Sequence, residues 1–402
     1  MAGPLPEGEA VPESGLLPES AALGASVRTL SAYLHIPFCS HRCGYCDFNT
    51  YTATELRGLT REGYLVALDA EITHSKQVLQ ESKVPTRSLS SVFIGGGTPT
   101  LLPASALTST LAVLRENYGI VSGAEITVEA NPDTLSAEYL VQLAAGGVTR
   151  VSIGMQSAVP HVLKTLERTH NPANVGSAVQ WAKDAGLAVS VDLIYGTPGE
   201  SLSDWQQTVE AAMNYGLDHV SAYSLIVEEG TAMARKINRG EIPVPDGDLQ
   251  ADMYELADDA FEAAGLTWYE ISNWSRSPET ESSHNRAYWT GQDWWGFGPG
   301  AHSHIGGVRF WNAKHPAAYS ERLAAGITPA VGREVLTDEQ RAVEEYLLES
   351  RLRDGIAIAG VEANILMNLQ DEQLVTLENE RATLTRRGRL LADEVARQLT
   401  EN

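Results

Sequence analysis

The chain has 402 residues, of which 43% are hydrophobic and 20% charged, the composition of a soluble globular protein with room for two domains. Its net charge of −23 would repel a phosphate backbone, so we expect no nucleic-acid partner. No apolar run is long enough to predict a membrane span. The N-terminus also lacks the features of a secretory signal, so we expect a cytoplasmic protein.

Residues 1–28 are expected to form a disordered acidic tail. Residues 1–27 are rich in Pro, Gly, Glu, Ala and Ser, with four glutamates and no Lys or Arg. Such a composition buries too little apolar surface to compensate for the entropy of ordering.

A regular alternation follows the tail. Apolar, β-branched runs fall near 30–36, 91–95, 124–129, 150–155, 187–194 and 219–226, and helix-like stretches fall near 60–81, 103–118, 136–146, 171–186 and 201–216. This rhythm predicts βαβ units and a parallel sheet. Six units fit a partial (β/α) barrel, but a doubly wound open sheet would show the same pattern.

Unusual residues follow each predicted strand. They are the cysteine loop, Gly95–Pro99, Glu129–Pro132, Gly154–Gln156, Asp192 with Tyr195–Pro198, and Tyr223–Ile226. Barrel enzymes place their sites at the C-terminal ends of strands. We therefore expect these residues to converge on one site, with Arg168 suited to pairing with a carboxylate.

All three cysteines lie after the first predicted strand, as Cys39-x3-Cys43-x2-Cys46. Three thiolates could hold three irons of a [4Fe-4S] cluster, which normally takes four cysteines. The fourth iron would then be open to a small chelator. A zinc site with His35 or His41 as fourth ligand is the alternative, although zinc ligands usually come from two separate knuckles.

Beyond residue 265, tryptophan, histidine and glycine become frequent, and the chain after 333 is helical and charged. The segment His284-Asn-Arg-Ala-Tyr288-Trp289 has two interpretations. It is an aromatic turn packed on the barrel, or a ligand face in which His284 coordinates haem iron. His302 and His304 are weaker candidates for the same role.

These motifs together resemble the radical SAM superfamily, through the cysteine spacing, Tyr45 before the last cysteine, and Gly95-Gly-Gly-Thr-Pro99. The resemblance implies a partial (β/α)6 barrel in which Cys39, Cys43 and Cys46 bind a [4Fe-4S] cluster. The open iron of that cluster would take S-adenosylmethionine (SAM). By position in the motifs, the residues implied to line the SAM site are Tyr33, Gly96, Gly97, Thr98, Glu129, Gln156, Arg168, Asp192 and Ile226.

More narrowly, residues 30–400 resemble the HemN/HemW group, which contains oxygen-independent coproporphyrinogen III oxidase and its haem-chaperone relative. Phe48 stands where the oxidases carry an extra cysteine, and the intact motif from His284 to Trp289 marks the chaperone branch. The resemblance implies a barrel at 29–265 and a smaller α+β and helical HemN-type domain at 266–402.

The implied function is that of a haem chaperone without coproporphyrinogen oxidase activity. Its ligand is haem, held at or near His284, and its partners are haem-accepting membrane enzymes such as respiratory oxidases. A homodimer is also considered. The alternatives are an oxidase that decarboxylates coproporphyrinogen III to protoporphyrinogen IX, and a structural iron–sulfur protein that does not use SAM.

Overall fold

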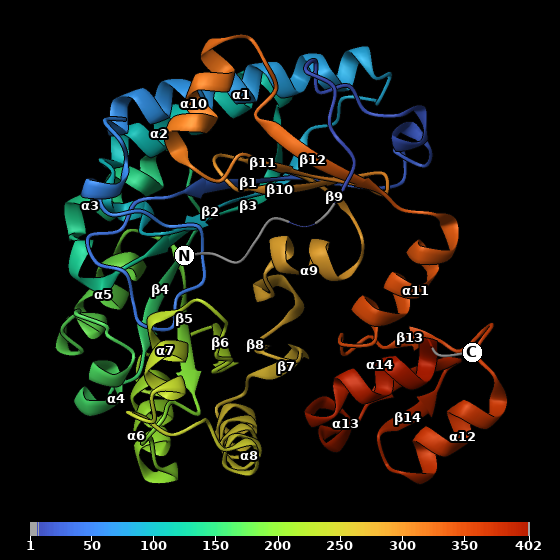
Figure 1. Cartoon of the computed structure of the whole chain (residues 1–402). Coiled ribbons are helices and arrows are strands. Elements are labelled where there is room, and N and C mark those ends of the chain that lie inside the picture. Colours follow the sequence, from blue (N-terminus) through green and yellow to red (C-terminus); the bar gives the residue numbers. More distant parts are fainter. Residues whose placement is uncertain (1–5, 7, 401–402) are drawn as a thin grey trace.

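The computed structural model describes residue 6 and residues 8–400. Within them, a twelve-stranded sheet has the order β12-β11-β10-β9-β1-β2-β3-β4-β5-β6-β8-β7 (Figure 1). Its centre is formed by the six predicted strands, β1 Leu30–Ile36, β2 Leu89–Gly96, β3 Ile120–Ala130, β4 Arg150–Gln156, β5 Ala188–Tyr195 and β6 His219–Ser224. They are parallel and adjacent in chain order. A doubly wound sheet reverses its order, so the fold is the expected partial (β/α)6 barrel.

The helices between these strands cover the outside of the barrel (Figure 1). They are α1 Arg61–Glu81, α2 Ala104–Tyr118, α3 Ala137–Ala145, α4 Pro160–Thr165, α5 Ala173–Asp184 and α6 Leu202–Met213. Local sequence sets their starts: Ser136 caps α3 by accepting from Tyr139 N, and Ser201 and Asp204 form a capping box on α6. Strand β4 is buried at every position, as expected for a strand covered on both faces.

Between residues 29 and 265, three α-helices fall outside the predicted stretches, namely α4, α7 Ala232–Asn238 and α8 Gly247–Ala263. Helices α4 and α7 are short and flank the cysteine loop. Helix α8 packs against α6 and buries Met253, Tyr254 and Phe261. The predicted sixth strand ends at Ser224, so Ile226 lies in the loop beyond it.

The sheet continues past residue 265, where a second domain was expected to begin. Strands β7 Thr267–Glu270 and β8 Asn273–Ser275 extend it beyond β6. On the other side β9 Asp293–Phe297 pairs in parallel with β1, and β10 His302–Ile305, β11 Val308–Asn312 and β12 Ala330–Val335 follow it. Trp274, Trp295 and Phe297 join the same hydrophobic core as the barrel strands.

Two further helices accompany these strands. Helix α9 Ser283–Trp289 carries the motif from His284 to Trp289, and α10 Pro316–Ala324 packs on α1.

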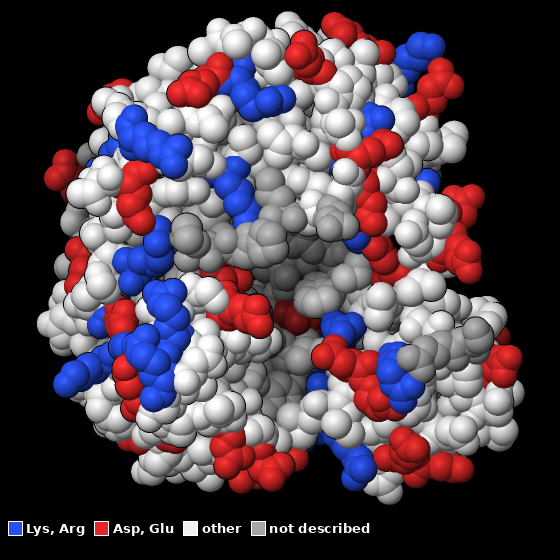
Figure 2. Space-filling model, in the orientation of Figure 1, with Lys and Arg blue, Asp and Glu red and all other residues white. Residues whose placement is uncertain are grey.

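A C-terminal module follows, comprising α11 Asp338–Glu349, β13 Ile356–Ala357, α12 Ala363–Asp371, β14 Val375–Glu378, β15 Arg381–Leu384, α13 Arg386–Leu390 and α14 Ala392–Thr400. It has its own core, which includes Leu369 and Val395. Arg389 attaches the module to the main body by a buried ion pair with Asp258 at 2.7 Å. Figure 2 shows acidic and basic side chains interspersed over one face and a hollow between body and module.

The predicted disordered tail is wrong for residues 8–28, while residues 1–5 and 7 lie outside the described residues. Leu17, Ala21 and Ala25 are buried against the body. Glu9 pairs with Arg333 of β12 through two backbone hydrogen bonds. The composition of the segment is polar, but its few apolar residues find a tertiary partner that composition cannot reveal. In the part of the chain that the structure describes, no helix is long and apolar enough to cross a membrane.

Candidate functional site

A cavity of about 540 Å³ opens at the C-terminal ends of the parallel strands and extends into the barrel. The residues predicted to bind the cluster and SAM, together with His284, all lie on its wall: Tyr33, Cys39, Cys43, Cys46, Gly96, Gly97, Thr98, Glu129, Gln156, Arg168, Asp192, Ile226 and His284. The first twelve come from the six parallel strands and the loops that follow them, and His284 comes from α9. The fold thus gathers residues that are up to 251 positions apart, from Tyr33 to His284.

The cysteine loop is held from several sides by backbone hydrogen bonds. Cys39 N donates to Tyr51 O at 3.0 Å, Gly44 N donates to Leu166 O at 3.1 Å, and Met233 N donates to Gly44 O at 2.8 Å. Tyr45 packs into a small core between α4 and α7. The three thiols are therefore presented by a loop whose path is set by its neighbours.

The thiols are partly buried, and burial raises the pKa of Cys39 and raises that of Cys46 to about 12. A thiolate is stable here only beside positive charge. Arg168 donates to Cys43 Sγ at 3.6 Å, and the Thr98 hydroxyl lies 4.0 Å from Cys39 Sγ. Three thiols on one cavity wall, with a guanidinium and a hydroxyl beside them, fit an iron–sulfur cluster.

The zinc alternative finds less support. A zinc ion would need His35 or His41 as a fourth ligand beside the three cysteines. The ring nitrogens of His35 contact Asn49 O at 2.9 Å and the Tyr33 hydroxyl at 3.0 Å. His41 is exposed at the cavity wall.

The glycine loop after β2 lies directly on the cysteine loop. Gly97 N donates to Ile36 O and Thr98 N to Phe38 O, both at 2.7 Å. A Cβ on Gly97 would lie 2.5 Å from the Phe38 carbonyl oxygen, and Gly96 has a φ of +110° with a Cβ position 2.5 Å from the His35 ring. Only glycine permits both the conformation and this close approach.

Two half-buried carboxyl groups face the cavity below the glycine loop. Burial, reinforced by the charge of Asp192, raises the pKa of Glu129 to about 7. Burial also raises the pKa of Asp192 to about 6, against the opposing effect of the Ser152 hydroxyl, which donates to the carboxylate and lies 2.9 Å from each of its two oxygens. Glu129 accepts from Gly96 N at 3.0 Å, so the glycine loop and the carboxylate hold each other in place.

The remaining predicted residues lie at the cavity mouth. Gln156 ends β4 in the left-handed region, with a φ of +60°, which non-glycine residues adopt mainly at strained sites. Arg168 donates to Gly154 O at 2.9 Å, and its buried Nε has no partner among the described residues. Ile226 and Phe48 are exposed on the rim and give it an apolar edge.

His284 lies at the far end of the same cavity, but both its ring nitrogens are engaged. Nδ1 contacts Ser91 Oγ and Nε2 contacts the Tyr288 hydroxyl, each at 2.9 Å. Phe93 stacks on the ring at 5.2 Å between centroids. Burial lowers the pKa of His284 to about 3. Iron coordination would therefore require one of these hydrogen bonds to break.

The two weaker histidine candidates lie elsewhere. His302 is exposed and stacks on Trp311. His304 lines a second cavity of about 210 Å³ between α9 and α11.

Comparison with known proteins identifies the family of the chain. Residues 33–212 match the model of the radical SAM superfamily. The heme chaperone HemW of Mycobacterium tuberculosis is 46% identical over 371 residues, which cover 91% of this chain and 94% of that protein. The heme chaperone HemW of Bacillus subtilis is 34% identical, covering 91% of this chain and 97% of its own.

The chain belongs to the HemW family of the radical SAM superfamily. The solved structure of coproporphyrinogen III oxidase (HemN) from Escherichia coli matches with a TM-score of 0.79, covering 95% of this chain and 92% of that one. At 23% identity, that likeness establishes the fold alone. The HemW relationship covers both the barrel and the C-terminal module.

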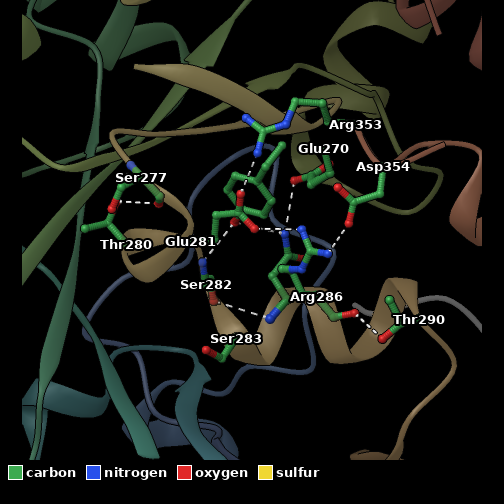
Figure 3. A network of polar contacts seen from close by, with 12 residues as sticks. Glu270, Ser277, Thr280, Glu281, Ser282, Ser283, Arg286, Thr290, Arg353 and Asp354 are labelled. Carbon is green, nitrogen blue, oxygen red and sulfur yellow. Dashed lines mark hydrogen bonds and ion pairs between the residues drawn. The ribbon is translucent and has the colours of Figure 1, made fainter. Parts of the chain in front are cut away.

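The sequence analysis did not identify the residues that hold α9 in place in this HemW family member. Glu125 on β3 accepts from Ser282 Oγ at 3.0 Å and Ser283 N at 3.0 Å, at the start of the helix. Figure 3 shows the other attachment, where Glu281 lies between Arg286 and Arg353. Glu125 is one polar residue in a strand and Glu281 one acid in a loop, so no local signal could have identified them.

Proposed function

We propose that this protein is a cytoplasmic haem chaperone. In this proposal it binds haem together with a SAM-coordinating [4Fe-4S] cluster, and it delivers haem to haem-dependent membrane enzymes such as respiratory oxidases. The observation that carries it is the 46% identity with a heme chaperone HemW over nearly the whole of both chains. The single cavity that joins the cysteine loop to α9 supports it.

In this proposal Cys39, Cys43 and Cys46 hold the cluster, and one iron remains open for the amino and carboxylate groups of SAM. The cluster supplies an electron when it is reduced. The side chains proposed to position SAM are Tyr33, Thr98, Glu129, Gln156, Arg168, Asp192 and Ile226, with the backbone of Gly96 and Gly97. His284 and the aromatic residues of α9 are proposed to face the haem.

The experiment that tests the proposal is a haem titration of the reconstituted protein, followed by its absorption spectrum. We expect one haem per chain and a SAM-induced change in the EPR spectrum of the reduced cluster. Transfer to a haem-free respiratory oxidase in membranes would test delivery. A protein that takes up no haem would contradict the proposal.

The rival function is tested on the same sample. With SAM, reductant and coproporphyrinogen III, an oxidase would form protoporphyrinogen IX at catalytic turnover, whereas we expect none. Phe48 supports this expectation, since it is exposed at the mouth of the cavity where the oxidases carry another cysteine. If SAM does not change the EPR spectrum of the reduced cluster, the result would instead favour a structural iron–sulfur protein. Sedimentation with and without SAM would test the proposed homodimer.

A further inference from the structure

A chain of serine hydroxyls runs from β1 and β2 to His284, and it determines where each proton lies. Ser90 Oγ donates to the Leu30 carbonyl oxygen at 3.1 Å. A carbonyl oxygen can only accept, and a hydroxyl has one proton to donate. The 3.2 Å contact between Ser31 Oγ and Ser90 Oγ must therefore have Ser31 as its donor.

The same reasoning extends to the imidazole. Because the proton of Ser31 points to Ser90, Ser91 Oγ is the donor in its 2.9 Å hydrogen bond to Ser31. Ser91 then has only lone pairs left for the 2.9 Å contact with His284 Nδ1. The histidine must donate there, so Nδ1 carries the proton.

The other ring nitrogen of His284 consequently has a free lone pair. The ring is buried, which favours its neutral form, and a neutral imidazole has a single N–H, which is on Nδ1. Nε2 is therefore an acceptor, and Tyr288 Oη donates to it at 2.9 Å. The two residues are one helical turn apart on α9, which places them side by side.

This is the arrangement that metal-ligating histidines usually have: one nitrogen donates to a supporting group and the other points its lone pair outward. Stacking on Phe93 holds the ring plane. Tyr288 is half-buried and borders both the main cavity and the second cavity. Its ring meets Trp294 edge-on at 4.7 Å.

We propose that the Tyr288 hydroxyl is a removable cap on a pre-formed iron ligand, His284 Nε2, and that Ser31, Ser90 and Ser91 position it by keeping the proton on Nδ1. In the exchange, the O–H···Nε2 hydrogen bond would break, and Nε2 would then be free to hold the haem iron. No proton leaves the imidazole, and no electron is transferred. The inference rests on the proposed haem-binding function.

A haem titration of full-length variants tests the cap. Tyr288→Phe removes the competing hydroxyl and should tighten haem binding about three- to tenfold, the equivalent of one hydrogen bond. The spectrum of histidine coordination should be retained, whereas His284→Ala should lose it. Tyr118→Phe is the matched control, because it deletes another buried tyrosine hydroxyl, 2.6 Å from Ser75 and remote from the cavity.

Unchanged or weaker haem binding by Tyr288→Phe would overturn the cap, and so would an unchanged spectrum of His284→Ala. Both results leave the proposed function standing if the wild-type protein takes up haem. A wild-type protein without haem uptake would contradict the proposed function and, with it, the iron-binding part of this inference.

The proton position is tested without haem, by ¹⁵N NMR of the ligand-free protein labelled at histidine. We expect the His284 signals of a ring protonated at Nδ1. Ser91→Ala should move part of the proton to Nε2 and weaken haem binding about ten- to a hundredfold, as loss of a supporting group does at metal sites. A wild-type ring protonated at Nε2 would overturn the inference whatever the haem result.

Discussion

Arg150 on β4 and Glu125 on β3 form an ion pair of 3.2 Å, with both side chains 8% exposed. Glu125 also accepts from the hydroxyl and backbone groups that begin α9, including His284 N at 3.3 Å. A carboxylate at a helix N-terminus is favoured by the helix dipole. Two strands of the barrel thus set the position of the helix that carries His284.

Replacing Glu125 with Gln should destabilise the protein by about 2–4 kcal/mol, because Arg150 then remains buried without its counter-charge. Urea denaturation followed by tryptophan fluorescence would measure the loss. Glu116→Gln is the control, since Glu116 is exposed on α2. Equal stability of the two variants would contradict this account of α9.

The network in Figure 3 predicts how the C-terminal module is attached. The Glu281 side chain is 4% exposed and lies 2.7 Å from Arg286 on α9 and 3.1 Å from Arg353 in the turn between α11 and β13 of the module. Arg286 also pairs with Asp354. Glu281→Gln should cost about 1–3 kcal/mol and speed proteolytic cleavage between residues 336 and 355.

The matched control for that cleavage is Glu339→Gln, because Glu339 is exposed on α11. If Glu281→Gln and its control are cleaved at the same rate as the wild type, the network does not hold the module.

Glu71 predicts a pH dependence of stability. Burial raises the pKa of this α1 carboxyl from 4.5 to about 7, although Gly298 N and Asn312 Nδ2 donate to it at 2.7 Å. The folded state therefore binds the proton more tightly than the unfolded state. This contribution is fully present below pH 4.5 and is lost as the pH rises to about 7.

The loss from this one group should be on the order of 3 kcal/mol. The free energy of unfolding of the wild type and of Glu71→Gln would be measured by denaturation at pH values from 4.5 to 7.5. The contribution of Glu71 is the difference between the two proteins in how steeply this free energy falls with pH. Parallel curves would show that Glu71 does not titrate in this range.

Gly96 should be intolerant of a side chain. Gly96→Ala combines a left-handed backbone with a Cβ 2.5 Å from the His35 ring, so we expect a loss of about 2–4 kcal/mol and weaker SAM binding. Gly291 also has a positive φ, +60°, but the space around its Cβ position is open. Gly291→Ala should therefore lower the free energy of unfolding by only about 1–2 kcal/mol. Calorimetry of both would separate the clash from the backbone strain.

Much of the candidate site could be predicted because its signals are local. The three cysteines lie within eight residues, and each strand end carries its own polar or glycine-rich cue. Parallel strands place their C-terminal ends at one edge, so local cues were enough to gather Cys39, Gly96, Glu129 and Asp192. The acidic tail was mispredicted because its order depends on Leu17 and Ala21 meeting a distant surface.

The sequence by itself determined the alternation of strands and helices, the three-cysteine loop and the positions of its polar strand ends, since periodicity and spacing are properties of short segments. Only the tertiary structure decided that the strands form a partial barrel rather than an open doubly wound sheet, because that choice concerns which strands are neighbours. It also decided the state of His284. Ser91 lies 193 positions away from it, and only folding brings the two into the hydrogen bond that places the proton.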